Sequence, residues 1–155
     1  MIPPWVLAFW TLSICRHVEP ERADTAEVTS ICLEIAESAQ DAPLWPGDAG
    51  TYRTAALLVS IAWHESHLTR QAQNNQSCGP WQTPCLEPRT AATALVHIAR
   101  SLHDCGDLTQ YASGRCGGAP LTAGYREQLG IRLSLMAPVE APRAALPRRA
   151  PCLAP

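Results

Sequence analysis

The sequence predicts a mainly α-helical protein with at most a small β-hairpin, stabilised by disulfide bonds. Three observations support this fold class. Apolar residues recur at helical spacing in several segments, no run alternates over the length of a strand, and seven cysteines occur in 155 residues. A chain of this length is expected to form one domain. We divide it into an N-terminal segment (residues 1–18), a folded domain (residues 19–136) and a Pro/Ala/Arg-rich tail (residues 137–155).

The N-terminal segment allows two interpretations. Trp5 to Ile14 has the length of the apolar region of a secretion signal, but no Lys or Arg precedes it and no clear cleavage site follows. We interpret it as a degenerate export signal, and the alternative is a first core segment docked on the domain. In the tail, proline recurs every few residues, so we expect it to be extended rather than helical.

Two helices are expected in the first half of the domain. The segment from Pro20 to Ala42 is predicted to be amphipathic. Its apolar face comprises Val28, Ile31, Cys32, Ile35 and Ala39. The segment from Thr54 to Ser66 is apolar in nearly every direction around a helix, which predicts burial on most sides. With about 13 residues it is too short to cross a bilayer, which needs roughly 20.

Glu65 is the only carboxylate in this apolar helix, and it lies in the last turn. The helix dipole and the neighbouring Trp63 both disfavour a negative charge there, so we expect the pKa of Glu65 to be raised. A carboxylic acid that keeps its proton near neutral pH can act as a general acid. The alternative is a solvated residue at the exposed end of a core helix.

The second half of the domain is expected to form a loop and further helices. Gln71 to Cys85 is polar and broken by glycine and proline, which is typical of a loop that lines a cleft. Pro88 to Cys105 is predicted to be helical. Its inner face is expected to comprise Ala92, Leu95, Val96, Ala99 and Leu102. Leu108 to Gly114 follows after a short turn, and Tyr125 to Met136 is predicted to be the last helix.

The cysteine spacing favours disulfides in an oxidising compartment, because it contains no CxxC pair typical of zinc sites. Cys78 with Cys85 and Cys105 with Cys116 each bracket a short, turn-rich loop, so we pair them. Cys15 with Cys32 is a further candidate, which leaves one cysteine over. Buried free thiols in a cytosolic protein are the alternative.

Composition and motifs exclude several functions. A net charge of −2 and a pI of about 6.2 do not indicate a nucleic-acid-binding surface. His64, Glu65 and His67 fall one residue short of the His-Glu-x-x-His pattern of zinc proteases, and no third ligand is obvious. We therefore expect no metal, no cofactor, no nucleic acid and no stable membrane span. We also expect a monomer.

Three short motifs follow one another in the domain. They are His64-Glu65-Ser66, Gly79-Pro80-Trp81-Gln82 and Tyr111-Ala112-Ser113-Gly114. In their order and spacing they resemble the signatures of the soluble lytic transglycosylases and goose-type lysozymes. In that family, a helix ends in Glu-Ser, a loop carries Gly-Leu-Met-Gln, and a later segment carries Tyr-Asn-x-Gly. The resemblance covers about residues 45–136. It implies a lysozyme-like fold and a cleft that binds peptidoglycan glycan strands.

The resemblance also implies residue roles. Glu65 is the expected catalytic acid and base, and Ser66 and Gln82 are expected to hydrogen-bond substituents of the sugar. Trp81 is expected to offer a flat face to a sugar ring, and Tyr111 to hydrogen-bond in the cleaving subsite and position Glu65. The alternatives are structural: Trp81 in the core, Ser66 as a helix C-terminal residue, and Tyr111 as a packed aromatic whose hydroxyl is already bonded. Ala112 departs from the family, which has asparagine there.

The resemblance leaves the reaction type open between two outcomes. Conventional glycosidases use two carboxylates, about 5 to 9.5 Å apart, and the later half of the domain has no motif with a second catalytic acid. We therefore favour a lytic transglycosylase that cuts between N-acetylmuramic acid and N-acetylglucosamine. A lysozyme-type hydrolase of the same bond is the alternative. Because of Ala112, a secreted module that binds glycan with little catalysis is a third hypothesis.

Overall fold

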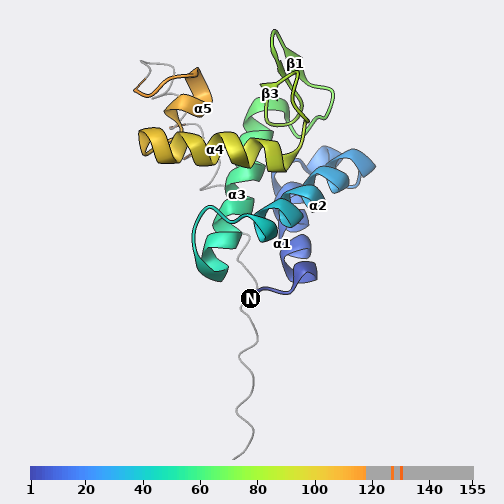
Figure 1. Ribbon diagram of the computed structural model, residues 1–155. Helices are drawn as coiled ribbons and strands as arrows, with labels where there is room; N and C mark the ends of the chain where they lie inside the picture. Colours follow the sequence, from blue (N-terminus) through green and yellow to red (C-terminus); the bar gives the residue numbers. More distant parts are fainter. Residues whose placement is uncertain (118–126, 128–129, 131–155) are drawn as a thin grey trace, which may run out of the picture.

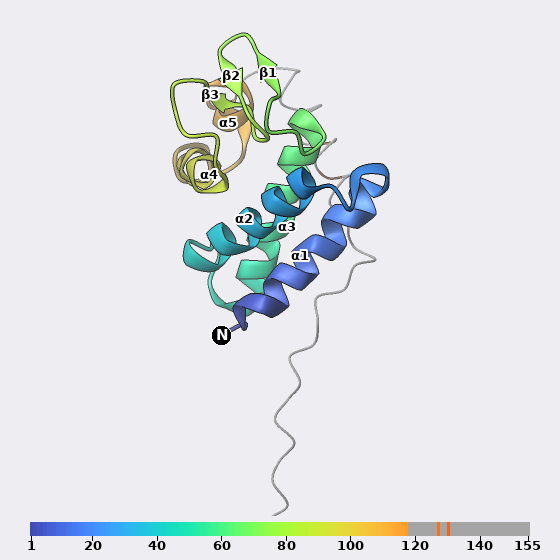
Figure 2. The same ribbon diagram turned by 90° about the vertical axis from the view of Figure 1, so that its right-hand side faces the viewer.

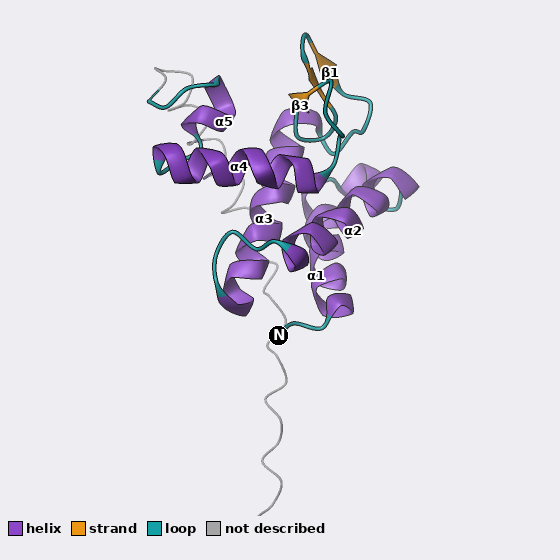
Figure 3. Cartoon of the chain, viewed as in Figure 1, coloured by secondary structure: helices purple, strands orange, loops and turns teal. Residues whose placement is uncertain are grey.

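The computed structural model describes residues 1–117, 127 and 130, and these residues form a mainly helical protein with one small sheet (Figure 1, Figure 3). The helices are α1 (Pro4–Val18), η1 (Pro20–Arg22, a 3₁₀ turn), α2 (Ala26–Asp41), α3 (Gly47–Ser66), α4 (Ala91–Cys105) and α5 (Thr109–Ser113). The strands are β1 (Gln73–Asn74), β2 (Ser77–Cys78) and β3 (Thr83–Pro84). The predicted helix Tyr125 to Met136 and the tail lie outside the residues described, apart from Glu127 and Gly130.

Helices α1, α2 and α3 pack against one another and contain most of the core (Figure 2). The amphipathic pattern predicted for α2 is confirmed, since all five residues of its apolar face are buried. This helix begins later than predicted because Thr25 caps it. The Thr25 side chain accepts a hydrogen bond from the Val28 amide and satisfies a donor that the helix leaves free.

Helix α1 is part of this core. Its inward face buries six residues. They are Leu7, Trp10, Thr11, Ile14, Cys15 and Val18. A disulfide joins Cys15 to Cys32 on α2, as the cysteine spacing allowed. This arrangement corresponds to the docked-segment interpretation of the N-terminus. The outward face of α1 carries the exposed aromatic residues Trp5 and Phe9.

Helix α3 runs through the centre of the molecule and ends at the candidate site (Figure 1). Every residue from Leu57 to Ala62 is buried, which confirms that the apolar helix is enclosed on most sides. The helix extends seven residues before Thr54, back to Gly47. Among the described residues, no helix is both long and apolar enough to cross a membrane.

The loop after α3 folds into a three-stranded antiparallel sheet, with the order β1-β2-β3. Gln73 pairs with Cys78, and Cys78 pairs with Thr83, so each strand is only two residues long. The disulfide between Cys78 and Cys85 closes this sheet, as predicted. The sequence allowed at most a hairpin, and the structure adds one strand to it.

Helix α4 is present as predicted, but the predicted inner face is wrong. The buried residues are Ala91, Ala94, Leu95, Ile98 and Ser101. Of the predicted set, Ala92, Val96 and Ala99 are exposed and line an open groove between α2 and α4. The error arises because apolar residues occupy two adjacent faces of this helix, and the sequence periodicity does not distinguish the face that meets the core.

Candidate catalytic cleft

Glu65 lies in the last turn of α3, at a helix end that other elements hold in place. His67 and Leu68 follow with positive φ of 52° and 56°, a conformation that residues other than glycine seldom adopt. Arg22 fixes this turn, since its guanidinium donates to the carbonyl oxygen of His67 at 2.7 Å and to the hydroxyl of Thr69 at 3.0 Å. The chain thus leaves the helix sharply, and Glu65 remains at the end of α3, half-buried.

Ser66 connects the end of α3 to the loop that carries the second motif. Its hydroxyl lies 2.9 Å from the carbonyl oxygen of Ala62 and 3.0 Å from that of Pro80, and it accepts a hydrogen bond from the Thr69 amide at 3.1 Å. These contacts use the hydroxyl for structure. Ser66 therefore positions the Gly79–Gln82 loop beside Glu65, and its hydroxyl is not free for a sugar.

The Gly79–Gln82 loop has a backbone that few sequences can adopt. Gly79 has a φ of +79°, and a Cβ there would lie 2.8 Å from Cβ of Arg89, so both the conformation and the space require glycine. Gln82 has a φ of +49°, and its side-chain amide donates to the carbonyl oxygen of Gly79 at 2.9 Å. A left-handed conformation at a residue other than glycine is costly and often marks a functional position.

Trp81 does not offer a face to a sugar ring. Only 1% of its surface is exposed, and its indole N–H donates to the carbonyl oxygen of Leu58 in α3 at 3.0 Å. The expected sugar-stacking role is therefore corrected, because the ring is buried in the core. Trp81 instead fixes the loop against the central helix, which again sets the position of Gln82.

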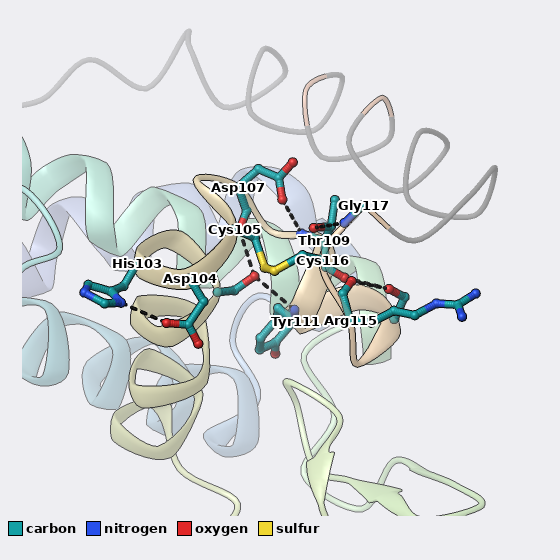
Figure 4. The surroundings of a disulfide bond; sticks show 11 residues. His103, Asp104, Cys105, Asp107, Thr109, Tyr111, Arg115, Cys116 and Gly117 are labelled. Atoms are coloured by element: carbon teal, nitrogen blue, oxygen red, sulfur yellow. Dashed lines mark hydrogen bonds and ion pairs between the residues drawn. A yellow bond between two sulfur atoms is a disulfide. The ribbon is translucent and has the colours of Figure 1, made fainter.

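The third motif begins in the short helix α5, which α4 and a disulfide position (Figure 4). Cys105, at the end of α4, is bonded to Cys116, as predicted. The hydroxyl of Ser101 donates to the carbonyl oxygen of Asp107 at 2.7 Å and accepts from the amide of Tyr111 at 3.1 Å. The disulfide and these two hydrogen bonds orient Tyr111 toward the other two motifs.

Tyr111 contacts the second motif, and the first motif affects its pKa. Its hydroxyl donates to the carbonyl oxygen of Trp81 at 2.6 Å. The pKa of Tyr111 is raised strongly, first by burial and then by the negative charge of Glu65. The phenol therefore stays neutral at physiological pH and keeps its proton as a donor.

A polar cavity of about 290 Å³ lies beside these residues. Gln82 and Tyr111 both line it. The remaining lining residues are Ser77, Thr83, Pro84, His97, Arg100, Gln110 and Gly114. Glu65 and Ser66 do not line this cavity, and the links to it are the hydrogen bonds from Ser66 to Pro80 and from Tyr111 to Trp81. The structure places Trp81 behind the cavity rather than in it.

Several residues that shape this site have no obvious sequence signal. Arg22 holds the end of α3 from a distance of about 45 positions, and Ser101 is a polar residue on the buried face of α4. Gln110 directly precedes the third motif and lines the cavity. Of these three residues, only Ser101 could have been found from the sequence, because it is a small polar residue within the apolar face of a helix. Ala112, the departure from the family pattern, is exposed on α5.

Among the described residues, the histidines that flank Glu65 are not grouped with two or more other potential metal ligands. His67 is exposed, and its Nδ1 lies 3.5 Å from a carboxylate oxygen of Glu19. Across residues 1–117, no three His, Cys, Asp or Glu side chains are arranged to hold a metal ion.

Comparison of the chain with protein families, with curated proteins and with solved structures finds no match in any of the three.

Proposed function

We propose that this protein is a peptidoglycan-cleaving lytic transglycosylase in which Glu65 is the single catalytic acid and base. The observation that carries the proposal is the convergence of three motifs distant in sequence. Ser66 is bonded to Pro80, Tyr111 is bonded to Trp81, and the charge of Glu65 acts on Tyr111.

The proposed reaction needs one proton donor that becomes a proton acceptor. Glu65 first gives its proton to the glycosidic oxygen as the bond between the muramic acid C1 and that oxygen breaks. The resulting carboxylate then takes the proton of the 6-hydroxyl of the same muramic acid as its oxygen bonds to C1. The reaction consumes no water, and the product carries a 1,6-anhydro ring.

Three other carboxylates of the second half have local partners, which favours a mechanism with one acid. Glu87 lies 2.7 Å from Nε2 of His97, Asp104 lies 2.8 Å from Nδ1 of His103, and Asp107 accepts a hydrogen bond from the Thr109 amide at 2.8 Å. Each of them is thus engaged in a local contact. The hydrolase alternative requires one of them, or a residue outside the described part, to act as a second carboxylate.

The neighbours of Glu65 have positioning roles in this proposal. Tyr111 remains protonated and donates its hydroxyl proton to the carbonyl oxygen of Trp81, so it holds the second motif in place beside Glu65. Gln82 presents its side chain to the cavity from a constrained backbone, where its amide can pair with an N-acetyl group. Ser66 and Trp81 hold the loop that carries Gln82. Trp81 acts from the core, in place of the stacking role that the sequence motif implied.

The three disulfides support export as part of this proposal, because such bonds persist in the periplasm and outside the cell. Peptidoglycan is found there as well. The resemblance to a lysozyme-like fold remains part of the proposal, and the observed mainly helical fold with a small sheet is compatible with it.

Product analysis tests the reaction type. Purified protein is incubated with cell walls, and the released fragments are examined by mass spectrometry. The proposal predicts fragments that end in 1,6-anhydromuramic acid, 18 Da lighter than the reducing ends that a hydrolase forms, as expected for loss of one water. Reducing ends would establish the hydrolase alternative. No fragments, with retention of the protein on the walls, would favour the binding module, for which the exposed Ala112 is the supporting observation.

A further inference from the structure

An open groove of about 820 Å³ lies between α2 and α4. Its α4 wall includes Ala92, Val96 and Ala99, which were predicted to face the core and are exposed instead. His97 and Arg100, on another face of α4, line the polar cavity. Because the groove and the polar cavity use different faces of one helix, a ligand of the groove is independent of the proposed reaction.

Apolar residues from two parts of the chain line the groove. Val96 is 59% exposed, although valine is among the residues most often buried. Pro43 and Leu44, in the loop after α2, add apolar surface from another element. A contiguous apolar surface of this kind is typical of an interaction site. The described residues leave the groove open, so its occupant lies outside them.

The α2 side of the groove carries negative charge. Glu34, Glu37 and Asp41 line the groove from this helix. Arg70 pairs with Glu34 at 2.7 Å, whereas the carboxylates of Glu37 and Asp41 form no ion pair or hydrogen bond within the described residues. In the same part of the chain, no basic side chain lines the groove. An occupant that matches the groove therefore combines apolar side chains with positive charge.

The C-terminal part of the chain has this chemistry. Residues 118–155 contain five of the 12 arginines and two of the 14 acidic residues, which gives them a net charge of +3 and leaves −5 on residues 1–117. Within the tail, Arg143, Arg148 and Arg149 stand among alanine, leucine and proline, with Glu140 as the one acid. The two parts of the chain are thus opposite in charge, and the tail is also rich in apolar residues.

The tail is long enough to reach the groove. Gly130 is the last described residue, and thirteen positions separate it from Arg143. An extended chain covers about 3.3 Å per residue, so this stretch spans up to about 40 Å, which exceeds the diameter of about 30 Å of a small domain. Attachment to the same chain also gives the tail an effective concentration of about a millimolar, which favours it over a separate basic protein.

We propose that the tail, residues 137–155, docks in the α2–α4 groove of its own chain. Leu146 packs against Val96, and the adjacent arginines lie beside the unpaired carboxylates of α2. Proline restricts the undocked tail, so docking costs less conformational entropy than it would for an unrestricted segment. The docked tail completes the packing of α4 on the face that the core leaves open.

A spin label on the tail tests the proposal in the full chain. The three disulfides use six of the seven cysteines and leave Cys152 to carry a nitroxide, so no cysteine has to be introduced. We expect the amide NMR signals of Ser38 and Val96, in the groove, to lose intensity and to regain it when ascorbate reduces the nitroxide. Signals of Trp5 and Phe9, on the outward face of α1, should change little, since α1 and α4 lie on opposite sides of α2 (Figure 2).

Two pairs of substitutions in the labelled chain test the charge contribution. Glu37→Gln with Asp41→Asn should lower the ratio of docked to free tail about two- to tenfold, the effect of two exposed ion pairs. Glu21→Gln with Asp24→Asn makes the same change in net charge at residues that do not line the groove, and it should preserve the ratio. Sodium chloride at about 1 M, where the Debye length is about 3 Å, should act on the wild-type chain as the first pair does.

The apolar contribution is tested by a second matched comparison. Val96→Ser should also lower the ratio of docked to free tail, because it removes apolar surface from the α4 wall. Leu33→Ser changes an exposed leucine of α2 that does not line the groove, and it should preserve the ratio. Thermal melts confirm that each variant is folded at the temperature of the measurement.

The contrary outcomes are distinct. Unchanged signals in the groove, or an equal loss of intensity over α1 and α4, overturn the proposal. If the control substitutions act as strongly as the groove substitutions, net charge alone attracts the tail, and the groove is not its site. The spin-labelled chain is also mixed with an isotopically labelled Cys152→Ser chain. A loss of intensity in this mixture as large as that within one chain would assign the groove to the tail of a second copy, which contradicts docking within one chain.

Discussion

The helical layer, formed by α1, α2 and α3 up to His64, and the site region, residues 65–117, are held together by different forces. In the helical layer, apolar side chains such as Ile35 and Leu58 are fully buried and supply most of the core. In the site region, side chains bond to backbone groups far along the chain, and two of the three disulfides close short loops.

This difference separates stability from activity. Burial is distributed over many residues, and the loss of one of them weakens the whole fold without moving the site. The site depends on a few specific bonds, such as those of Ser66 and Tyr111, and the loss of one bond moves a loop by a small amount. We therefore expect substitutions in the layer to lower stability more than activity, and substitutions in the site region to do the reverse.

Truncation in the layer should give the largest loss of stability. Ile35→Ala removes a fully buried side chain of α2, so the free energy of unfolding should fall by about 2 to 5 kcal/mol. Lytic activity per folded molecule should change little. Leu33→Ala, on the exposed face of the same helix, is the control and should cost about 0.5 kcal/mol or less. Urea denaturation measures both variants, and a similar loss in both would contradict the account.

Removing one disulfide from each region should distinguish the effects on stability and on activity most clearly. Cys78→Ser with Cys85→Ser should cost about 2 to 3 kcal/mol by the loop-entropy estimate, and it should also reduce activity because Gln82 lies between β2 and β3, inside the loop that this disulfide closes. Cys15→Ser with Cys32→Ser should cost about as much stability and leave the activity of the folded protein intact. Thermal melts and zymograms at a temperature where both variants are folded provide the comparison. Equal activity loss in the two pairs would refute the division.

Ser66→Ala should affect activity more than stability. Loss of the hydroxyl removes the link to Pro80 and leaves its carbonyl oxygen without this donor, at a cost of about 1 to 3 kcal/mol. Activity should fall at least tenfold, since the Gly79–Gln82 loop is then no longer held in position beside Glu65. Ser113→Ala, which removes a hydroxyl from the exposed end of α5, is the control and should do neither. An unchanged rate for Ser66→Ala would show that the link is dispensable.

Tyr111→Phe should give the smallest change in stability at neutral pH, about 1 kcal/mol for one hydrogen bond. The raised pKa of Tyr111 means that the folded protein keeps a proton that the unfolded chain loses near pH 10. Stability from this group is therefore complete below about pH 10 and declines as the pH rises further. Melting temperatures between about pH 8 and 11 should decline less steeply in the variant, and identical slopes would contradict the burial of the phenol.

The fold was predictable wherever burial follows a simple period. The face of α2 was predicted correctly because its apolar residues form one stripe, and α3 because it is apolar all round. The face of α4 was not, since alanine and valine extend the stripe to a second side. The disulfides were predictable because Cys78 with Cys85 and Cys105 with Cys116 bracket short loops.

The candidate site was predictable in its members and not in their contacts. Motif order indicated Glu65, Gln82 and Tyr111 as site residues, and hydrogen bonds link the segments that carry them, while their roles stay predictions. The bonds from Ser66 to Pro80 and from Tyr111 to Trp81 join a side chain to a distant backbone group, and such bonds leave no period in the sequence. The sequence left the position of Trp81 open for a related reason, because a tryptophan in a polar loop has the same local sequence whether it faces the core or the solvent.

The central claim is that Glu65 is the acid and base of a wall-cleaving reaction, and the Glu65→Gln variant tests it most directly. The substitution is nearly isosteric and removes the exchangeable proton. We predict that lysis of purified cell walls falls by at least about 100-fold, which is the usual contribution of a general acid or base. The melting temperature should stay within about 4 to 8 °C of the wild-type value. A variant that melts normally and still clears cell walls at the wild-type rate would contradict the claim.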